Sequence, residues 1–171
     1  MSTKSSTKIL MLPVLLAFGC SMFTPKAVPY EYENEEQVVY SFFINAGEGP
    51  ALILENTATG VSSGDVEQSL DYIKSGLPNL SRETIDNFIQ RNTQPDSLSP
   101  DMDLGADYVL LTREELLEIT SHPNWGELLT EAYPGSYGYT IFSRVGFNNS
   151  LDQALIYVGS VGGPLMGSGF Y

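Results

Sequence analysis

The chain of 171 residues is long enough for one domain and too short for two independent hydrophobic cores. Apolar residues make up 42% of it and charged residues 17%, which is typical of a globular protein and excludes a disordered or collagen-like chain. Acidic residues outnumber basic ones by 21 to 8, a net charge of −13, so the chain would repel phosphate groups. We therefore expect no nucleic-acid partner.

The N-terminus has the pattern of an export signal. Lys4 and Lys8 precede an apolar run that ends at Phe18, and Gly19 stands directly before Cys20, the single cysteine. The apolar run is about half the ~20 residues that a membrane-spanning helix needs. We therefore predict a bacterial lipoprotein signal that is cleaved before Cys20, with lipid attached to the Cys20 thiol.

Two interpretations of Cys20 are open, because Phe18 is atypical two positions before a lipidated cysteine. In the second, Cys20 is an ordinary small residue near an uncleaved or conventionally cleaved signal peptide. The first predicts a signal peptide over 1–19, a lipidated tether over 20–30 and a single domain over 31–171. It also predicts a location in the bacterial cell envelope, anchored to a membrane and facing the periplasm or the exterior.

The sequence pattern in the first half of the domain predicts three helices and one strand. Apolar residues spaced four apart follow Glu31 and predict a helix, and the apolar run 51–54 between turn signals predicts a buried strand. Asp65 is placed to cap a helix that ends near Gly76. Ser81 is placed to open another that ends near Asn92, and residues 93–105 have loop composition.

The second half predicts two more helices and a hairpin. Residues 108–111 read as a strand, and Thr112 with Glu115 forms the capping box of the clearest helix signal. Asn124 is placed to cap a further helix that stops at Pro134. Alternating apolar residues over 139–145 and a second run over 154–158 predict a hairpin, and the glycine-rich stretch 159–169 predicts a loop. The fold class is α+β, with several short helices packed on one face of a small antiparallel sheet that ends in the C-terminal hairpin.

Five segments of the second half resemble a group of bacterial exported proteins and lipoproteins that has no established reaction. They are 108–116, 133–136, Phe-Ser-Arg-Val-Gly-Phe-Asn at 142–148, Gln-Ala-Leu-Ile-Tyr-Val-Gly at 153–159, and Gly-Pro-Leu at 163–165. In that group a strand leads into a capped acidic helix, a Pro-Gly stop and a three-strand meander. The resemblance implies this fold and export, and no activity.

The chain departs from the group in two places. Relatives commonly carry a cysteine pair where Gly162 and Met166 stand here, so the resemblance implies that a loop disulfide is lost. Relatives also continue into a further strand, whereas this sequence ends at Tyr171. We therefore expect that the domain lacks its last strand or strands, which would leave residues 154–158 as an exposed edge or covered only by the short tail of Phe170 and Tyr171.

Few residues of the sequence are candidates for catalysis or metal binding. His122, the single histidine, precedes a proline at a helix end, which is typical of a cap or a surface residue, and no Gly-x-Ser-x-Gly motif occurs. Asp101, Asp103 and Asp107 alternate as in a calcium loop, but the glycine stands one position early and a solvated acidic loop is favoured. We therefore predict no catalytic residue, no metal site and no cofactor.

Two further groups of charged residues were candidates for a site. Glu31, Glu33, Glu35 and Glu36 lie in the first turn of the first predicted helix, where stabilisation of the helix dipole explains them as exposed residues. Arg144 lies on a predicted strand beside apolar residues. A guanidinium there binds a carboxylate in two-point fashion, either within the protein or on a ligand, so Arg144 is the candidate for a ligand contact or a structural ion pair.

The leading functional hypothesis is an envelope-anchored binding or structural module without enzymatic activity. Its partners would be the membrane, through the N-terminal lipid, and another envelope protein or a glycan. The alternative is an envelope hydrolase that uses Asp or Glu carboxylates in a cleft between helices and sheet, and a pocket that holds two carboxylates roughly 5–10 Å apart would favour it.

Overall fold

The computed structural model describes residues 33–44, 48–61, 66–163 and 166–171. The predicted signal peptide, Cys20 and the predicted tether lie outside these residues, as do Glu31 and Asp65. No helix within the described ranges is long and apolar enough to cross a bilayer.

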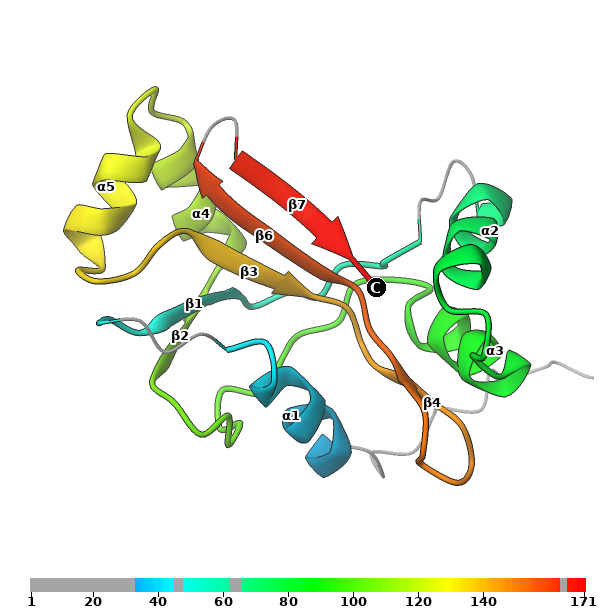
Figure 1. Cartoon of the computed structure of the whole chain (residues 1–171). Coiled ribbons are helices and arrows are strands. Elements are labelled where there is room, and N and C mark those ends of the chain that lie inside the picture. The colour runs from blue at the N-terminus through cyan, green and yellow to red at the C-terminus, as the bar shows by residue number, and fades with distance from the viewer. Residues whose placement is uncertain (1–32, 45–47, 62–65, 164–165) are drawn as a thin grey trace, which may run out of the picture.

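A five-stranded mixed sheet forms the centre of the fold (Figure 1). Its order is β2-β1-β3-β6-β7, with the bounds β1 Ala51–Leu54, β2 Tyr108–Leu111, β3 Tyr139–Phe142, β6 Val158–Gly163 and β7 Met166–Phe170. β1 pairs in parallel with both β2 and β3, and the pairs β3–β6 and β6–β7 are antiparallel. The predicted antiparallel pairing therefore holds for β3, β6 and β7 but not for β1 and β2, because helical crossovers after β1 and after β2 return the chain in the same direction.

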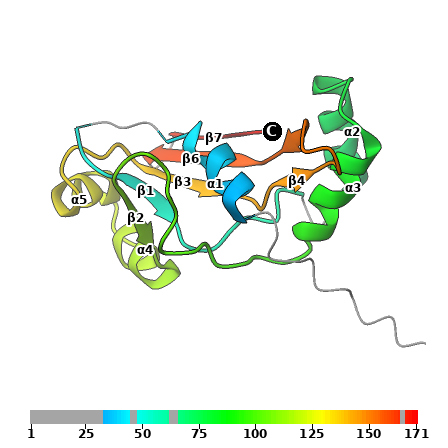
Figure 2. The ribbon, with the colours of Figure 1, turned by 90° about the horizontal axis from the view of Figure 1, so that it is seen from below.

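The described residues also form five helices, which confirms the α+β class. They are α1 Glu33–Ser41, α2 Val66–Gly76, α3 Arg82–Arg91, α4 Arg113–Thr120 and α5 Trp125–Ala132. The prediction that the helices pack on one face of the sheet is wrong. Figure 2 shows α2 and α3 at one end of the molecule and α4 and α5 at the other.

Alternation along the strands explains why both faces are covered. Ile53 packs with Tyr40 of α1 in one buried cluster, whereas its neighbour Leu52 packs with Trp125 and Leu129 of α5 in another. Successive residues of a strand point to opposite faces, so the apolar run of β1 needs a helix layer on each side.

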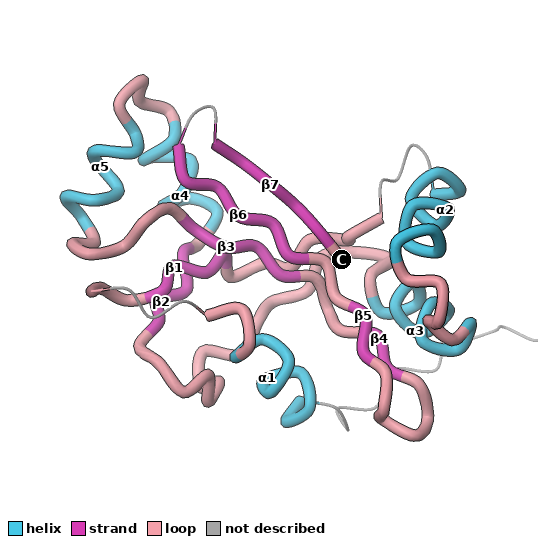
Figure 3. Tube along the Cα trace, viewed as in Figure 1, coloured by secondary structure: helices cyan, strands magenta, loops and turns pink. Residues whose placement is uncertain are grey.

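A second, two-stranded sheet extends the predicted hairpin beyond the main sheet (Figure 3). It consists of β4 (Gly146–Phe147) and β5 (Ala154–Leu155), and it packs against α3. The hairpin is thus present, but its ladder is interrupted at residues 143–145 and at the facing residues 156–157. This interruption is where the buried charges of the fold meet.

The predicted cap of α4 is confirmed. The Thr112 hydroxyl accepts a hydrogen bond from the Glu115 amide (3.2 Å), and the Glu115 carboxylate accepts one from the Thr112 amide (2.9 Å). The bonds from Thr112 hold the pKa of Glu115 below its ordinary value. Ser81 caps α3 as predicted, whereas the Asn124 side chain makes no cap hydrogen bond at α5.

The glycine-rich segment predicted as a loop forms strands β6 and β7. β6 has β3 on one side and β7 on the other, so both neighbours supply backbone partners that local composition does not reveal. Gly169 leaves room for the Tyr157 ring, because a Cβ atom there would overlap the Tyr157 hydroxyl unless that side chain shifted. Val158 pairs with Phe142 on one side and with Phe170 on the other, so the exposed edge is wrong at this residue and the alternative, cover by the chain end, is the one observed.

We predict that Gly146→Ala destabilises the fold by about 2 kcal/mol, because its Cβ atom would lie 2.5 Å from backbone atoms of Phe88 in α3, which cannot yield easily. Gly126→Ala in α5 is the control, because a Cβ atom there meets nothing within 4 Å and alanine favours the helix. Urea unfolding followed by circular dichroism measures both. Equal stability of the two variants would contradict the packing of α3 on β4.

Candidate functional site

A buried carboxylate, Glu36, lies at the centre of the only cluster of buried charges that the described residues show. Its residue exposure is 4%, so the prediction of an exposed first-turn glutamate is wrong for this position. The reason is helical spacing: Glu36 lies four residues before Tyr40, on the face of α1 that packs on the sheet. The apolar stripe at Val39 and Phe43 already placed position 36 near that face.

Both oxygens of Glu36 are occupied by arginines. Oε2 lies 2.6 Å from Nη2 of Arg144 and 3.1 Å from Nη2 of Arg91, while Oε1 accepts a hydrogen bond from Nε of Arg144 at 3.0 Å. The Glu36 and Arg91 side chains are each 5% exposed. A carboxylate and a guanidinium in this two-point geometry form the strongest common type of ionic hydrogen bond.

Arg144 binds a second carboxylate at the surface. Its Nη1 lies 2.5 Å from Oδ2 of Asp96, whose side chain is 59% exposed. Burial alone would lower the pKa of Arg144, but the hydrogen bonds and charge of Glu36, together with the charge of Asp96, raise it above its ordinary value. Of the two roles that the sequence left open for Arg144, the geometry is that of an internal ion pair.

Side chains of Glu36, Arg91 and Asn92 provide the backbone hydrogen bonds that the interrupted ladder lacks. The Asn92 amide accepts from the Arg144 backbone N–H at 2.8 Å and donates to the Arg144 carbonyl at 2.9 Å, as a neighbouring strand would. Glu36 accepts from the Val145 N–H at 2.8 Å, and Arg91 donates to the Val145 carbonyl at 2.8 Å. All four backbone groups of residues 144–145 are therefore held by side chains of α1 and the C-terminal end of α3.

Tyr40 adds an uncharged partner. Its ring stacks on Phe142 with centroids 4.8 Å apart, and its hydroxyl donates to the Ser143 carbonyl at 3.1 Å. Burial, together with the charge of Glu36, raises the pKa of Tyr40 far above its ordinary value, so this phenol stays protonated. Ser143 is itself buried, and its hydroxyl accepts from the Tyr157 N–H at 2.8 Å.

This arrangement leaves Glu36 unsuited to acid–base chemistry. A general base needs a free lone pair within reach of a substrate proton, and the lone pairs of Glu36 already face two guanidiniums and a backbone amide. The cluster therefore acts as a structural centre that joins α1, α3 and the β3–β4 junction.

The other residues considered from the sequence are not brought together. His122 is exposed just after α4, and within the described ranges no three His, Cys, Asp or Glu residues are placed to hold a metal ion. Asp103 instead accepts a hydrogen bond from Gly105 of its own loop at 3.3 Å. Cys20 lies outside the described residues.

An open hollow of about 350 Å³ lies beside β2. Its lining residues are Pro100, Ala106, Asp107, Tyr108 and Leu110. Asp107 is the single carboxylate among these described lining residues, so the hollow does not supply the pair of carboxylates that the hydrolase alternative requires.

Comparison of the chain with protein-family models, curated proteins and solved structures gives no match. The resemblance through segments 142–148 and 153–159 therefore stays an expectation. The function proposed below depends on the residues and their geometry.

We predict that Glu36→Gln lowers the free energy of unfolding by about 3 kcal/mol, because the buried guanidinium of Arg91 and the partly exposed one of Arg144 lose their shared counter-charge while the side-chain shape is kept. Glu83→Gln on the exposed side of α3 is the control, with an expected change of about 0.5 kcal/mol or less. Chemical denaturation measures both variants. A Glu36→Gln protein as stable as the control would refute the central role of this carboxylate.

Proposed function

We propose that the chain is a lipid-anchored protein of the bacterial cell envelope, facing the periplasm or the exterior, whose folded domain is a binding or structural module. The observation that carries this proposal is the convergence of a basic segment, a short apolar run and Gly19 on Cys20, the single cysteine. Acyl chains at Cys20 would hold this acidic protein at a membrane whose anionic lipids repel it.

A binding role is supported by how the domain distributes its charged and apolar side chains. The buried carboxylate of Glu36 is saturated by its arginine partners. Large apolar side chains instead lie at the surface: Phe42, directly after α1, is 78% exposed, and Val38 in the last turn of α1 is 58% exposed. Exposed aromatic and aliphatic groups of this kind are what partners bury on association.

We predict that Cys20→Ser moves the protein from the membrane fraction to a soluble or uncleaved form, because it removes the only thiol that lipid attachment could use. Ser21→Ala is the matched control and should stay with the membrane. Cell fractionation and the intact mass of the detergent-extracted protein measure the outcome. An N-terminus other than a lipid-modified Cys20 would overturn the anchor.

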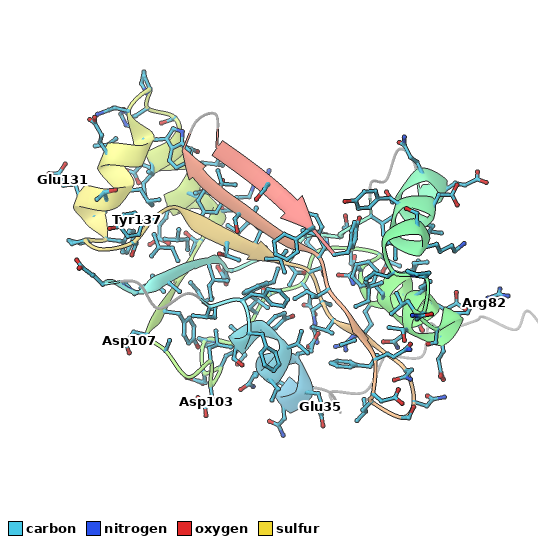
Figure 4. The ribbon with its side chains drawn as sticks, viewed as in Figure 1. Glu35, Arg82, Asp103, Asp107, Glu131 and Tyr137 are labelled. Atoms are coloured by element: carbon cyan, nitrogen blue, oxygen red, sulfur yellow. The ribbon has the colours of Figure 1, made fainter. Side chains whose placement is uncertain are left out.

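We predict that a photo-crosslinking residue at an exposed apolar position captures an envelope partner in intact cells. The positions to be replaced one at a time are Phe42, Tyr72, Leu117 and Tyr137. Arg82 on α3, whose side chain is 93% exposed, is the polar control; Figure 4 labels it and Tyr137. We expect at least one apolar position to give a discrete product that mass spectrometry identifies, and Arg82 to give none. Failure at all four positions would count against a binding module.

A further inference from the structure

The hollow beside β2 lies at an end of the main sheet. In the described part of the chain β2 pairs with β1 alone, and two backbone bonds fix its orientation. The Ala51 N–H donates to the Asp107 carbonyl, and the Glu55 N–H donates to the Leu111 carbonyl, each at 2.9 Å. Asp107 and Leu111 therefore turn their carbonyl groups toward β1.

The alternate residues of β2 face the other way. In a parallel pair, every second residue directs both its N–H and its C=O to the partner strand. Since Asp107 and Leu111 face β1, Val109 does so too, and Tyr108 and Leu110 present their backbone groups to the open side. An edge strand of this kind is a template for pairing with another extended segment.

The hollow supplies side-chain contacts next to these backbone groups. Tyr108 and Leu110 both line it and both are half-buried, so apolar surface and free backbone groups occur together. The Tyr108 hydroxyl donates to the Pro100 carbonyl at 2.7 Å, which holds the preceding loop against the strand. A segment added along β2 would place alternate side chains over the hollow.

The charge around this edge selects the occupant. Asp101, Asp103 and Asp107 are exposed in the loop that leads into β2, and Figure 4 shows Asp103 and Asp107 extending outward from the fold. A second copy of the chain would bring the same acids into contact, with a net charge of −13 on each copy. A segment that carries Lys or Arg would instead be attracted.

We propose that the β2 edge binds an extended segment of another protein in which apolar residues alternate with Lys or Arg, and that this segment adds a strand beside β2. The proposal rests on the binding role proposed above and names its surface. The other end of the sheet is less suited, because residues 167–169 of β7 are Gly-Ser-Gly and carry neither charge nor a large side chain.

A short labelled peptide of alternating lysine and valine is the probe, titrated by fluorescence anisotropy into the full chain in uncharged detergent at physiological salt. Replacing both Asp103 and Asp107 by lysine should weaken binding about tenfold or more. Lysine at both Glu83 and Asp86 on α3 makes the same change in total charge far from β2, and binding should change at most about twofold. Equal loss in both double variants would mean non-specific attraction and would overturn the proposal.

Leu110→Pro tests the backbone pairing. It removes the outward N–H without removing a bond to β1, so the strand should tolerate it while binding falls about tenfold or more. Leu110→Ala keeps the N–H and separates the loss of the side chain from the loss of pairing. Circular dichroism shows whether the variants fold. If they do not fold, hydrogen exchange of the unaltered protein tests whether the peptide pairs with β2.

Hydrogen exchange locates the bound peptide. Peptide binding should slow exchange of the Tyr108 and Leu110 amides about tenfold or more, because these groups gain partners, whereas the Val109 amide is already bonded to β1. Protection of β7 instead, or no peptide binding at all, would refute this site. Crosslinking in cells at another exposed position would then leave the binding role standing, whereas failure of both experiments would reject the two proposals together.

Discussion

The fold depends on satisfying the backbone of residues 144–145, where the ladder between β3 and β6 is interrupted. Buried N–H and C=O groups without a strand partner must find other hydrogen bonds. Asn92 supplies both bonds of Arg144, while Glu36 and Arg91 supply those of Val145. Three distant parts of the chain are thereby fixed to one point, and the ion pairs among the same side chains make each part dependent on the others. Removing one charge from such a group costs far more than the group contributes as a whole.

This constraint separates the interior from the surface in functional terms. The carboxylate of Glu36 and the guanidinium of Arg144 hold the fold together, so neither is free for a substrate. The features suited to recognition lie elsewhere, at the half-buried edge of β2 and on exposed apolar side chains such as Phe42. This distribution supports the binding role that we propose, because the buried arginine and glutamate side chains neutralise one another while large apolar groups remain exposed.

Several of residues 142–148 make different contacts that stabilise the fold. Phe142 fills the core beside Tyr40, Ser143 bonds across the interruption, and Arg144 forms the ion pairs. Gly146 allows close approach of α3, as a side chain there would overlap the backbone of Phe88. Several positions of this segment therefore have a specific neighbour elsewhere in the chain.

Local signals in the sequence determined the helices, the strands at 51–54 and 108–111, and the caps at Ser81 and Thr112, because those features depend on neighbours a few residues apart. The mixed sheet, the strands in the glycine-rich end and the burial of Glu36 were decided only by tertiary structure. A glycine-rich segment forms a strand when neighbouring strands provide hydrogen-bond partners for its backbone. Glu36 is buried because it forms ion pairs with arginines 55 and 108 residues away in the sequence. Spacing along the chain reveals which face of a helix a charge occupies, but its partner is chosen by contacts that bring remote segments together.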